Sequence, residues 1–492
     1  MPPVSSPGLG APSPRDAALS RVRFRRAVTL LLMTLFLPGS AQLVASRREV
    51  GRIAVRVWLS VVGTVVLVVL LGLLWHGFVF WLASNTVVLG FVRLVLCALA
   101  IGWALLFLDA WRLGQPLELL QKQRLAMVGL NGVLCFSVAG SLLFVSHMVA
   151  VQRGFITAMF GDGEATSAHH GRYNVLLLGG DSGADRWGLR PDSLTVASID
   201  ADTGKAILFG LPRNMTNFPF PKDSIMAEQF PDGYDCEGCE LNSLATWAQD
   251  NKSLFKGHAN PGVEATVEGV EGITGLTINY YAMVNLQGFR NMVQAVGGLT
   301  LNVRDRIPIG GVGGPVTGHI EPGVQRLNGY ETLWFARSRE SADDYSRMAR
   351  QKCVMNAMLQ QLSPQTVIRN FESIAKASEE LITTDLPASE LGTFAQLALK
   401  ARSQPVSTVS FVPPAINTGR PDIEKIHSMV QAAIDRSEGV TKPREQSTQA
   451  DAPKKKAKKG YTRSRQSTVG GSIGNLHQGY AANEATDLSS AC

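Results

Sequence analysis

An α-helical membrane region followed by an α/β domain is the fold class that the sequence predicts, and two observations carry the prediction. The first third of the 492-residue chain holds three apolar segments of membrane length. After residue 165, short apolar runs of strand type alternate with amphipathic helical patterns, as they do in sheets flanked by helices. The formal charge of +7 indicates anionic partners, and six cysteines exclude a disulfide-rich scaffold.

The N-terminal residues 1–26 are predicted to form a disordered, basic tail. Pro, Ser, Gly and Ala dominate its first part, and the basic run RVRFRR ends it. The apolar run Ala27–Leu37 that follows is short, because Pro38-Gly39 stops it before it reaches membrane length. We therefore expect this run to be re-entrant or interfacial, within a membrane region that covers residues 27–152.

Three segments in this region meet the length of roughly 20 apolar residues that a bilayer requires. They are residues 57–75, 88–111 and 125–151. Arginines flank the first segment and Lys and Arg lie between the second and third, whereas the loop His76–Thr86 contains neither. Under the positive-inside rule, the N-terminus is cytoplasmic and the chain after about residue 152 lies outside. The expected location is therefore multi-pass in the cell membrane, with an extracytoplasmic domain at residues 165–440.

That domain opens with three short apolar runs of strand type, Val175–Leu178, Leu194–Ile199 and Ala206–Leu211. The last two are joined by Asp200-Ala-Asp-Thr-Gly204, a turn sequence that pairs them as an antiparallel hairpin. Further strands are predicted at residues 280–284, 299–303 and 406–412, and amphipathic helices after Asn285 and over 387–402. Residues 441–492, rich in Lys, Ser, Gln and Gly, are predicted to be a disordered basic tail.

Acids and arginines gather at the ends of the first strands, and a second mixed stretch occurs far along the chain. Acids mixed with guanidinium groups suit a divalent metal together with a phosphate or pyrophosphate, although solvated loop charges would look the same. In the second stretch we expect Leu333–Ala336 to be a strand edge, from whose end Arg337 and Arg339 project together. Arg347 and Gln351 are four apart, so they share one face of a helix. Two such stretches in one domain favour a functional site.

The segment Cys236-Glu-Gly-Cys239 lies in a predicted loop over residues 214–242. A C-x-x-C motif is compatible with a redox site, half a zinc site or a local disulfide. The sequence has no second Cys/His pair at zinc spacing, and the motif lacks a strand–helix redox context. For a domain outside the membrane, a disulfide between Cys236 and Cys239 that fixes this loop is the preferred interpretation.

Several longer motifs occur in a fixed order over about residues 172–362: LLLGGDSGADRWGLRPDSLTVASID, ILFGLPRN, FRNMVQAVGGLTLNV, and GVQRLNGYETLWFARSR followed by DDYSRMARQ. Together they resemble the LytR-CpsA-Psr (LCP) family of cell-wall enzymes, and the multi-span start is similar to actinobacterial members. The resemblance implies a three-layer α/β/α fold with a mixed central sheet and a hydrophobic pocket for a polyprenyl chain. It implies transfer of a glycopolymer from a polyprenyl-(pyro)phosphate carrier to peptidoglycan, with pyrophosphatase activity in some members.

The same resemblance assigns roles by motif position. The acids that match the family's metal ligands, for Mg²⁺ or Mn²⁺, are Asp181 and Asp192. The residues that match its catalytic arginines around the pyrophosphate are Arg190, Arg213, Arg337 and Arg339. The further polar residues of the site are Asp344, Arg347 and Gln351, of which Asp344 is our choice for the base. The chain departs from the pattern at Arg213-Asn-Met, where an acidic residue usually follows the arginine.

Two other functions use parts of the same sequence. Gly180-Asp-Ser-Gly183 resembles the nucleophile stretch of trypsin-like serine proteases. Between the membrane region and that stretch only His169 and His170 are available as a base, and the G-x-S-x-G elbow is not completed. A non-catalytic membrane regulator or polyprenyl-lipid-binding protein would use the same pocket and arginines. The acids Asp181 and Asp192 distinguish this alternative from the enzyme, since lipid binding alone has less need of a divalent ion.

Overall fold

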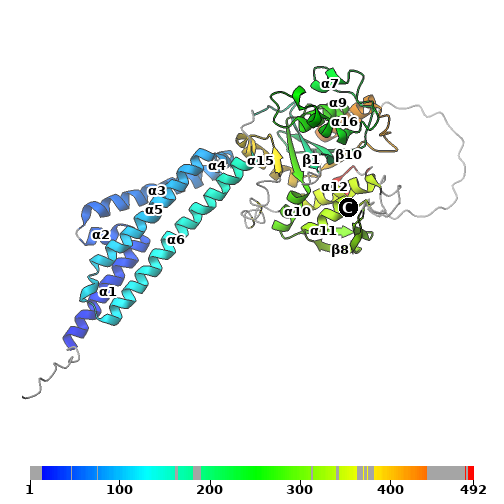
Figure 1. The fold of residues 1–492 in the computed structure, drawn as a ribbon. Coiled ribbons are helices and arrows are strands. Elements are labelled where there is room, and N and C mark those ends of the chain that lie inside the picture. The colour runs from blue at the N-terminus through cyan, green and yellow to red at the C-terminus, as the bar shows by residue number, and fades with distance from the viewer. Residues whose placement is uncertain are drawn as a thin grey trace, which may run out of the picture. The chain divides into compact units, whose positions relative to one another are not determined.

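The computed structural model describes residues 14–45, 47–74, 76–160, 165–180, 190–311, 314–339, 343–362, 370, 374, 382–439, 483 and 486–491. The chain forms two compact units, Met1–Gly154 and Phe155–Cys492. The described part of the first unit is helical, with α1 (Pro14–Phe36), α2 (Ser40–Val44), α3 (Arg48–Leu74), α4 (His76–Ser84), α5 (Thr86–Leu113) and α6 (Gln121–Met159) (Figure 1).

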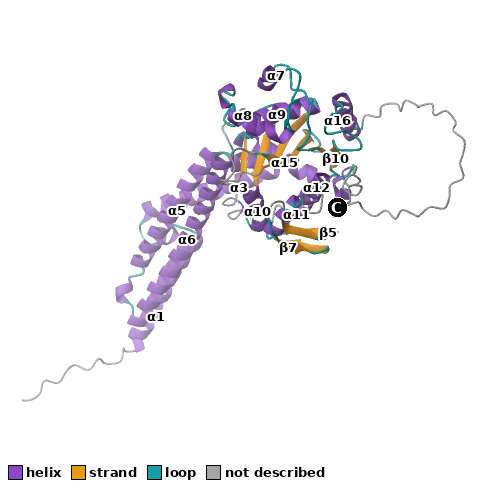
Figure 2. Ribbon diagram, turned by 45° about the vertical axis from the view of Figure 1, so that its right-hand side comes forward, coloured by secondary structure: helices purple, strands orange, loops and turns teal. Residues whose placement is uncertain are grey.

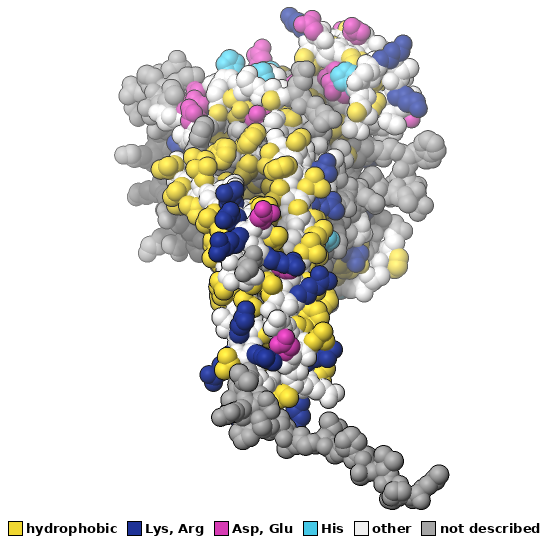
Figure 3. Space-filling model, turned by 90° about the vertical axis from the view of Figure 1, so that its left-hand side faces the viewer, with side chains coloured by type: hydrophobic (Ala, Val, Ile, Leu, Met, Phe, Trp, Pro, Cys, Tyr) yellow, Lys and Arg dark blue, Asp and Glu magenta, His cyan; other side chains and the backbone are white. Residues whose placement is uncertain are grey.

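Helices α3, α5 and α6 are long and apolar enough to cross a membrane, and no other helix in the described residues is. Helices α5 and α6 contain the predicted segments 88–111 and 125–151, and α3 contains 57–74 of the predicted 57–75, whose last residue lies outside the described residues. Their outer surface is apolar, with Leu73 70% and Phe91 66% exposed. Figure 3 shows hydrophobic side chains over most of this unit's face, with Lys and Arg gathered on the lower part of the helical column. An apolar outer face of this extent suits a membrane-embedded unit.

Helix α1 corrects the prediction for residues 14–26, which were predicted to be disordered and are helical. The apolar run after Ala27 continues the same helix, so it is not re-entrant, and its interfacial placement stays a prediction. The reason for the continuous helix is packing: Ala27 and Leu31 are fully buried in a cluster with Phe107 and Ala110 of α5, so the helix gains an apolar partner along its length. The helix ends at Phe36, just before the predicted Pro38-Gly39 stop.

A six-stranded mixed sheet forms the centre of the second unit, with strand order β10-β3-β2-β1-β4-β9. These strands are β1 (Arg172–Gly180), β2 (Pro191–Asp200), β3 (Ala206–Leu211), β4 (Tyr280–Asn285), β9 (Ile382–Thr384) and β10 (Ser407–Ser410). The predicted hairpin is confirmed, since β2 and β3 pair antiparallel with Ser198 opposite Ile207. β1 is antiparallel to β2 and parallel to β4, and β3 is parallel to β10, so the sheet is mixed as predicted.

Helices cover both faces of this sheet (Figures 1 and 2). On one side lie α8 (Leu244–Asp250), α9 (Pro261–Thr274) and α16 (Ile423–Glu438), and on the other α10 (Leu286–Ala295), α11 (Gly329–Arg337) and α12 (Asp344–Gln361). Successive side chains of β1 point to opposite faces of the sheet. Leu176 and Leu178 join the core beneath α9 and α16, whereas Leu177 lies on the side of α12, where it and Met355 of that helix line one cavity. The predicted three-layer α/β/α fold is therefore confirmed.

Two small two-stranded antiparallel sheets and several short helices complete the second unit. Its remaining described elements are α7 (Ile225–Gln229), β5 (Leu299–Val303), β6 (Ile307–Gly310), β7 (Val316–Ile320), β8 (Gly323–Leu327), α15 (Leu391–Arg402) and the 3₁₀ turns η2 to η5, of which η5 is Leu488–Ala491. β5 pairs with β8 and β6 with β7. The predicted disordered tail is wrong for the last described residues, because Asp487 pairs with Ser407 and Leu488 is 1% exposed.

Cys236 and Cys239 form the predicted disulfide, with their Cα atoms 5.1 Å apart. The loop around them is tied to the strand end that precedes it. The amide of Asn242 donates to the carbonyl of Arg213 at 3.0 Å, and the amide of Leu241 donates to the carbonyl of Met215 at 2.9 Å. The disulfide therefore restrains a loop that supports the backbone of Arg213.

Replacing both Cys236 and Cys239 with serine should lower stability only slightly. The bond closes a loop of very few residues, so its contribution is expected near 1 kcal/mol, at the low end of the usual range. A domain of this size should then lose about 2–4 °C of melting temperature. Differential scanning fluorimetry, with the reduced wild-type chain as the control, measures this. Two free thiols in protein trapped from intact cells would contradict both the disulfide and the outward location.

Candidate functional site

Two strand ends and the start of one helix bring the central charged residues together. The antiparallel register of β2 and β3 pairs Leu194 with Leu211. Asp192 and Arg213 each lie two residues beyond that pair, so the same register places them opposite one another. Helix α12 is capped by Asp343, and its first turn brings Asp344 and Arg347 to the same point.

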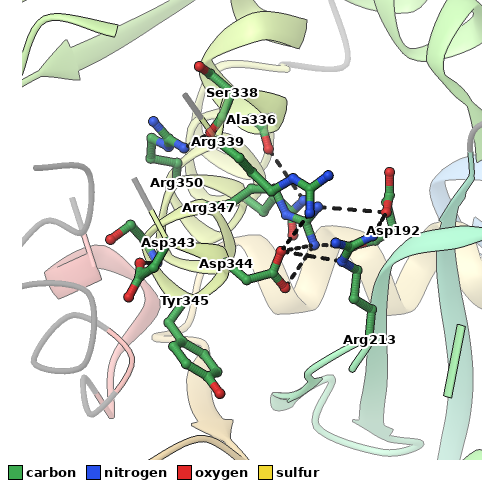
Figure 4. A network of polar contacts seen from close by, with 12 residues as sticks. Asp192, Arg213, Ala336, Ser338, Arg339, Asp343, Asp344, Tyr345, Arg347 and Arg350 are labelled. Atoms are coloured by element: carbon green, nitrogen blue, oxygen red, sulfur yellow. Dashed lines mark hydrogen bonds and ion pairs between the residues drawn. The ribbon is translucent and has the colours of Figure 1, made fainter. Parts of the chain in front are cut away.

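These four side chains form one ion-pair network (Figure 4). Arg213 bridges the two acids, with Nη1 2.6 Å from Oδ1 of Asp192 and Nε 3.3 Å from Oδ1 of Asp344. Arg347 does the same, with Nη2 3.0 Å from Oδ1 of Asp344 and Nη1 3.7 Å from Oδ1 of Asp192. Arg347 Nη2 also donates to the backbone carbonyl of Asp192 at 2.8 Å, which joins α12 to β2.

The network has an excess of positive charge. Arg339 adds a third guanidinium, 3.8 Å from Oδ1 of Asp344, so three arginines face two acids, a net charge of 3 − 2 = +1. The Arg347 side chain is only 2% exposed, and burial lowers its pKa despite the opposing effect of Asp344 and Asp192. Arginine keeps its charge under such conditions, and its planar group suits bidentate contact with phosphate oxygens. The cluster is therefore suited to an anion.

The structure changes the expected arrangement of the second stretch. Residues Leu333–Ala336 are not a strand edge but part of α11, because Asn328 and Glu331 form a capping box that starts a helix there. Arg337 and Arg339 therefore do not project together. The guanidinium of Arg337 lies 5.6 Å from the ring centre of Trp334, whereas Arg339 follows the helix and faces the network.

The remaining predicted site residues lie at different distances from this network. Gln351, one turn after Arg347, donates from Nε2 to the carbonyl of Ala336 at 3.3 Å, which links α12 to α11. Arg190 precedes β2, is exposed, and forms no ion pair with any residue that the structure describes. Asp181, the other predicted metal ligand, lies outside the described residues.

An apolar cavity of about 320 Å³ adjoins the network, between the sheet and helices α10, α11 and α12. Its apolar lining includes Leu177, Ala282, Val284, Phe289, Met292, Val354 and Met358. Its charged and polar lining includes Asp192, Arg337, Arg347 and Gln351, four of the residues predicted from the sequence. A cavity of this size can hold a small apolar ligand, and here its wall is shared with the arginine cluster.

Helix α12 has two further buried cations: Arg350, which belongs to the second charged stretch predicted from the sequence, and Lys352, which was not predicted to belong to the site. Arg350 is 2% exposed, donates to the carbonyl of Ser338, and has its pKa lowered to about 10 by burial. Lys352 is 4% exposed, and burial lowers its pKa to about 8. On the sequence, both resemble the charged face of an amphipathic helix. Their burial depends on segments that pack against α12 from elsewhere in the chain, so no local pattern indicates it.

Among the described acids, Asp192 is the one whose carboxylate fits a metal ion. The described residues contain no group of three or more His, Cys, Asp or Glu side chains that could hold a metal ion. Asp192 is 28% exposed, and Arg213 and Arg347 both approach the same oxygen, Oδ1. Its carboxylate is thus accessible to a cation from the Oδ2 side, and oxygen ligands of this kind suit Mg²⁺.

Comparison with known proteins places the second unit in a family. A model of the LytR_cpsA_psr family matches residues 158–433. Biofilm regulatory protein A of Streptococcus mutans is 24% identical over 46% of this chain and 53% of that protein. The polyisoprenyl-teichoic acid–peptidoglycan teichoic acid transferase TagU of Oceanobacillus iheyensis is 29% identical over 45% of this chain and 61% of that protein. The matched region therefore spans between half and two thirds of these relatives.

A solved structure, that of TagV from B. subtilis, covers 55% of this chain and 98% of its own, with 22% identity and a TM-score of 0.39.

Proposed function

This chain belongs to the LytR_cpsA_psr family, and on that premise we propose that it transfers a glycopolymer from a polyprenyl-(pyro)phosphate carrier to peptidoglycan. One observation carries the proposal: an apolar cavity shares its wall with a cluster of arginines that has excess positive charge. An isoprenoid chain attached to a pyrophosphate has the same two parts, an apolar tail and a dianionic head. The names of relatives such as TagU support the same substrate class.

In the proposed reaction, a sugar hydroxyl of peptidoglycan attacks the phosphorus atom that carries the glycopolymer. The new phosphorus–oxygen bond forms as the bond to the polyprenyl phosphate breaks, and the hydroxyl proton passes to a base or to water. Polyprenyl phosphate leaves with the electron pair. Arg213, Arg339 and Arg347 would bind the non-bridging oxygens, so the protein contributes chiefly position and electrostatic stabilisation.

Asp344 takes a different role in this proposal from the one its sequence position indicated. Arg213, Arg339 and Arg347 all approach its Oδ1. Arg347 Nη2 also donates to its Oδ2 at 3.1 Å, so both carboxylate oxygens are engaged by guanidinium groups rather than turned toward an attacking hydroxyl. We therefore assign Asp344 to holding the arginines in position, and the base is left to another group or to solvent.

A divalent cation, Mg²⁺ or Mn²⁺, is part of the proposal. Asp192 would hold it together with Asp181, whose position in the motif is eleven residues earlier. The ion would supply charge neutralisation for the pyrophosphate. Asp192 would also keep its contact with Arg213, so that the cation and the arginines lie on the same head group.

We propose that the chain is anchored by several membrane spans, with the second unit outside the cytoplasm. The three apolar helices and the Lys and Arg residues beside them support this orientation under the positive-inside rule. An outward location places the site where lipid-linked glycans and peptidoglycan meet. It also agrees with the disulfide between Cys236 and Cys239.

The test is transfer of a polyprenyl-linked glycan to peptidoglycan oligomers by the detergent-solubilised full chain, with and without Mg²⁺. Arg213→Ala should lower kcat/KM by about a hundredfold or more, as expected when a charge-stabilising donor is lost. Arg436→Ala, an exposed arginine on α16 across the sheet, serves as the matched control. A chelator should stop turnover of the wild type. Retention of the lipid without turnover in any metal would instead identify a lipid-binding regulator.

A further inference from the structure

The residue farthest along the chain with a buried polar side chain, in the described part, is Asn483, which is 2% exposed. It contacts two elements at once. Its Nδ2 donates to the carbonyl of Tyr345 at 2.8 Å, in the first turn of α12. Its backbone carbonyl oxygen lies 3.3 Å from Nζ of Lys352, two turns further along α12. Its side-chain Oδ1 lies 3.5 Å from Oγ of Ser410 on β10. A single side chain therefore joins α12 to the sheet.

Residues 486–491 continue this contact along the edge of the sheet. β10 is the edge strand, and the amide of Thr408 donates to the carbonyl of Thr486 at 2.9 Å. The amide of Leu488 donates to the carbonyl of Val406 at 2.9 Å. Backbone pairing of this kind satisfies N–H and C=O groups of an edge strand that would otherwise lack a strand partner. We call Asn483 together with residues 486–491 the C-terminal clasp.

The clasp also packs against the helix that carries the arginine cluster. Leu488, 1% exposed, is in one apolar cluster with Leu208 and Val406, against which Met355 and Leu359 of α12 pack. The ammonium of Lys352, buried on the same helix, has the clasp carbonyl and Oγ1 of Thr408 as its hydrogen-bond acceptors. Removing the clasp would expose this apolar surface and take one acceptor from a buried cation.

We propose that the C-terminal clasp sets the position of α12, and that Asn483 is a positioning residue for the arginine cluster. Asp344 and Arg347 lie on either side of Tyr345, whose carbonyl accepts from Asn483, in the first turn of α12. A shift of that turn moves both members of the ion-pair network together. The effect on transfer rests on the proposed function above, whereas the contact with α12 does not.

The experiment uses the full-length chain with three variants: Asn483→Ala, Leu488→Asp and, as the matched control on an exposed clasp residue, Ser489→Ala. Amide hydrogen exchange of residues 344–352 should speed up in the first two variants and stay unchanged in the third. Their kcat should fall by about tenfold to a hundredfold, the usual effect of a small misplacement, while KM for the lipid stays within about twofold. Asn483→Asp, which keeps Oδ1 but loses the donor to Tyr345, should behave as Asn483→Ala.

The outcomes separate the two proposals. Unchanged exchange and unchanged kcat in both Asn483→Ala and Leu488→Asp would overturn the clasp. If the variants show faster exchange in α12 but the wild-type chain itself transfers no glycan, the clasp is supported and the proposed function is rejected. Equal loss of kcat and of lipid affinity, with a fall in global melting temperature, would show general destabilisation and overturn the positioning role. If Leu488→Asp does not fold, Asn483→Ala alone decides, because it removes no apolar packing.

Discussion

Replacing Arg347 with methionine should abolish glycan transfer and lower the free energy of unfolding by about 3–5 kcal/mol, the usual cost of breaking a buried ion pair. Arg347 bridges Asp192 and Asp344 and is almost fully buried, so its loss leaves two partly buried carboxylates with fewer partners. It also removes the donor to the carbonyl of Asp192, which joins α12 to β2. Chemical denaturation followed by fluorescence, together with the transfer assay, measures both effects.

Arg347→Lys separates charge from geometry in the same experiment. Lysine keeps the positive charge but presents a single ammonium, which cannot reach both acids and the backbone carbonyl as a planar guanidinium does. We expect part of the stability to return while transfer stays lost. Arg436→Met, on the exposed face of α16, controls for the change in net charge. Wild-type turnover in Arg347→Met would show that the network is structural only and that the anion binds elsewhere.

Five of the six strands of the sheet were predicted because each has a local signal, whereas the three-residue edge strand β9 was not predicted. β1, β2 and β3 contain the predicted apolar runs, and the turn at Asp200–Gly204 determines the hairpin. The hairpin register in turn places Asp192 opposite Arg213, so part of the site follows from the sequence as well. β4 and its helix cap, Asn285, were likewise found from pattern alone, and the side chain of Asn285 accepts from the amide of Gly288.

What the sequence did not reveal depends on contacts between distant segments. Leu333–Ala336 is apolar enough for a strand, whereas the capping box at Asn328 and Glu331 starts a helix there. The burial of Lys352 depends on Asn483, which is separated from it by 131 positions. The helix at residues 14–26 depends on the α5 surface against which the later part of α1 packs. No periodicity within a short window contains such information.

The apolar lining of the cavity and the arginine cluster consist of different residues, so we expect that lipid-tail binding and chemistry can be impaired independently. Ala282 of β4 lines the apolar part of the cavity, opposite Leu177 in the parallel register of β1 and β4. Ala282→Phe should fill space that an isoprenoid chain needs, without touching an arginine. Excluding one five-carbon unit costs roughly 4 kcal/mol at about 0.8 kcal/mol per buried carbon group, or about a thousandfold in affinity.

This result is measured by titrating a long-chain polyprenyl phosphate and a short geranyl analogue against the full-length chain. The long chain should lose affinity by about a thousandfold, because its distal units no longer fit, as judged from the cost of excluding apolar groups. The short analogue, held mainly through its phosphate by the arginines, should change little. Ala432→Phe, on the exposed side of α16, is the matched control for an added aromatic ring. Equal losses for both lipids would mean that the ring disturbs the head-group site, and no loss for either would place the lipid outside this cavity.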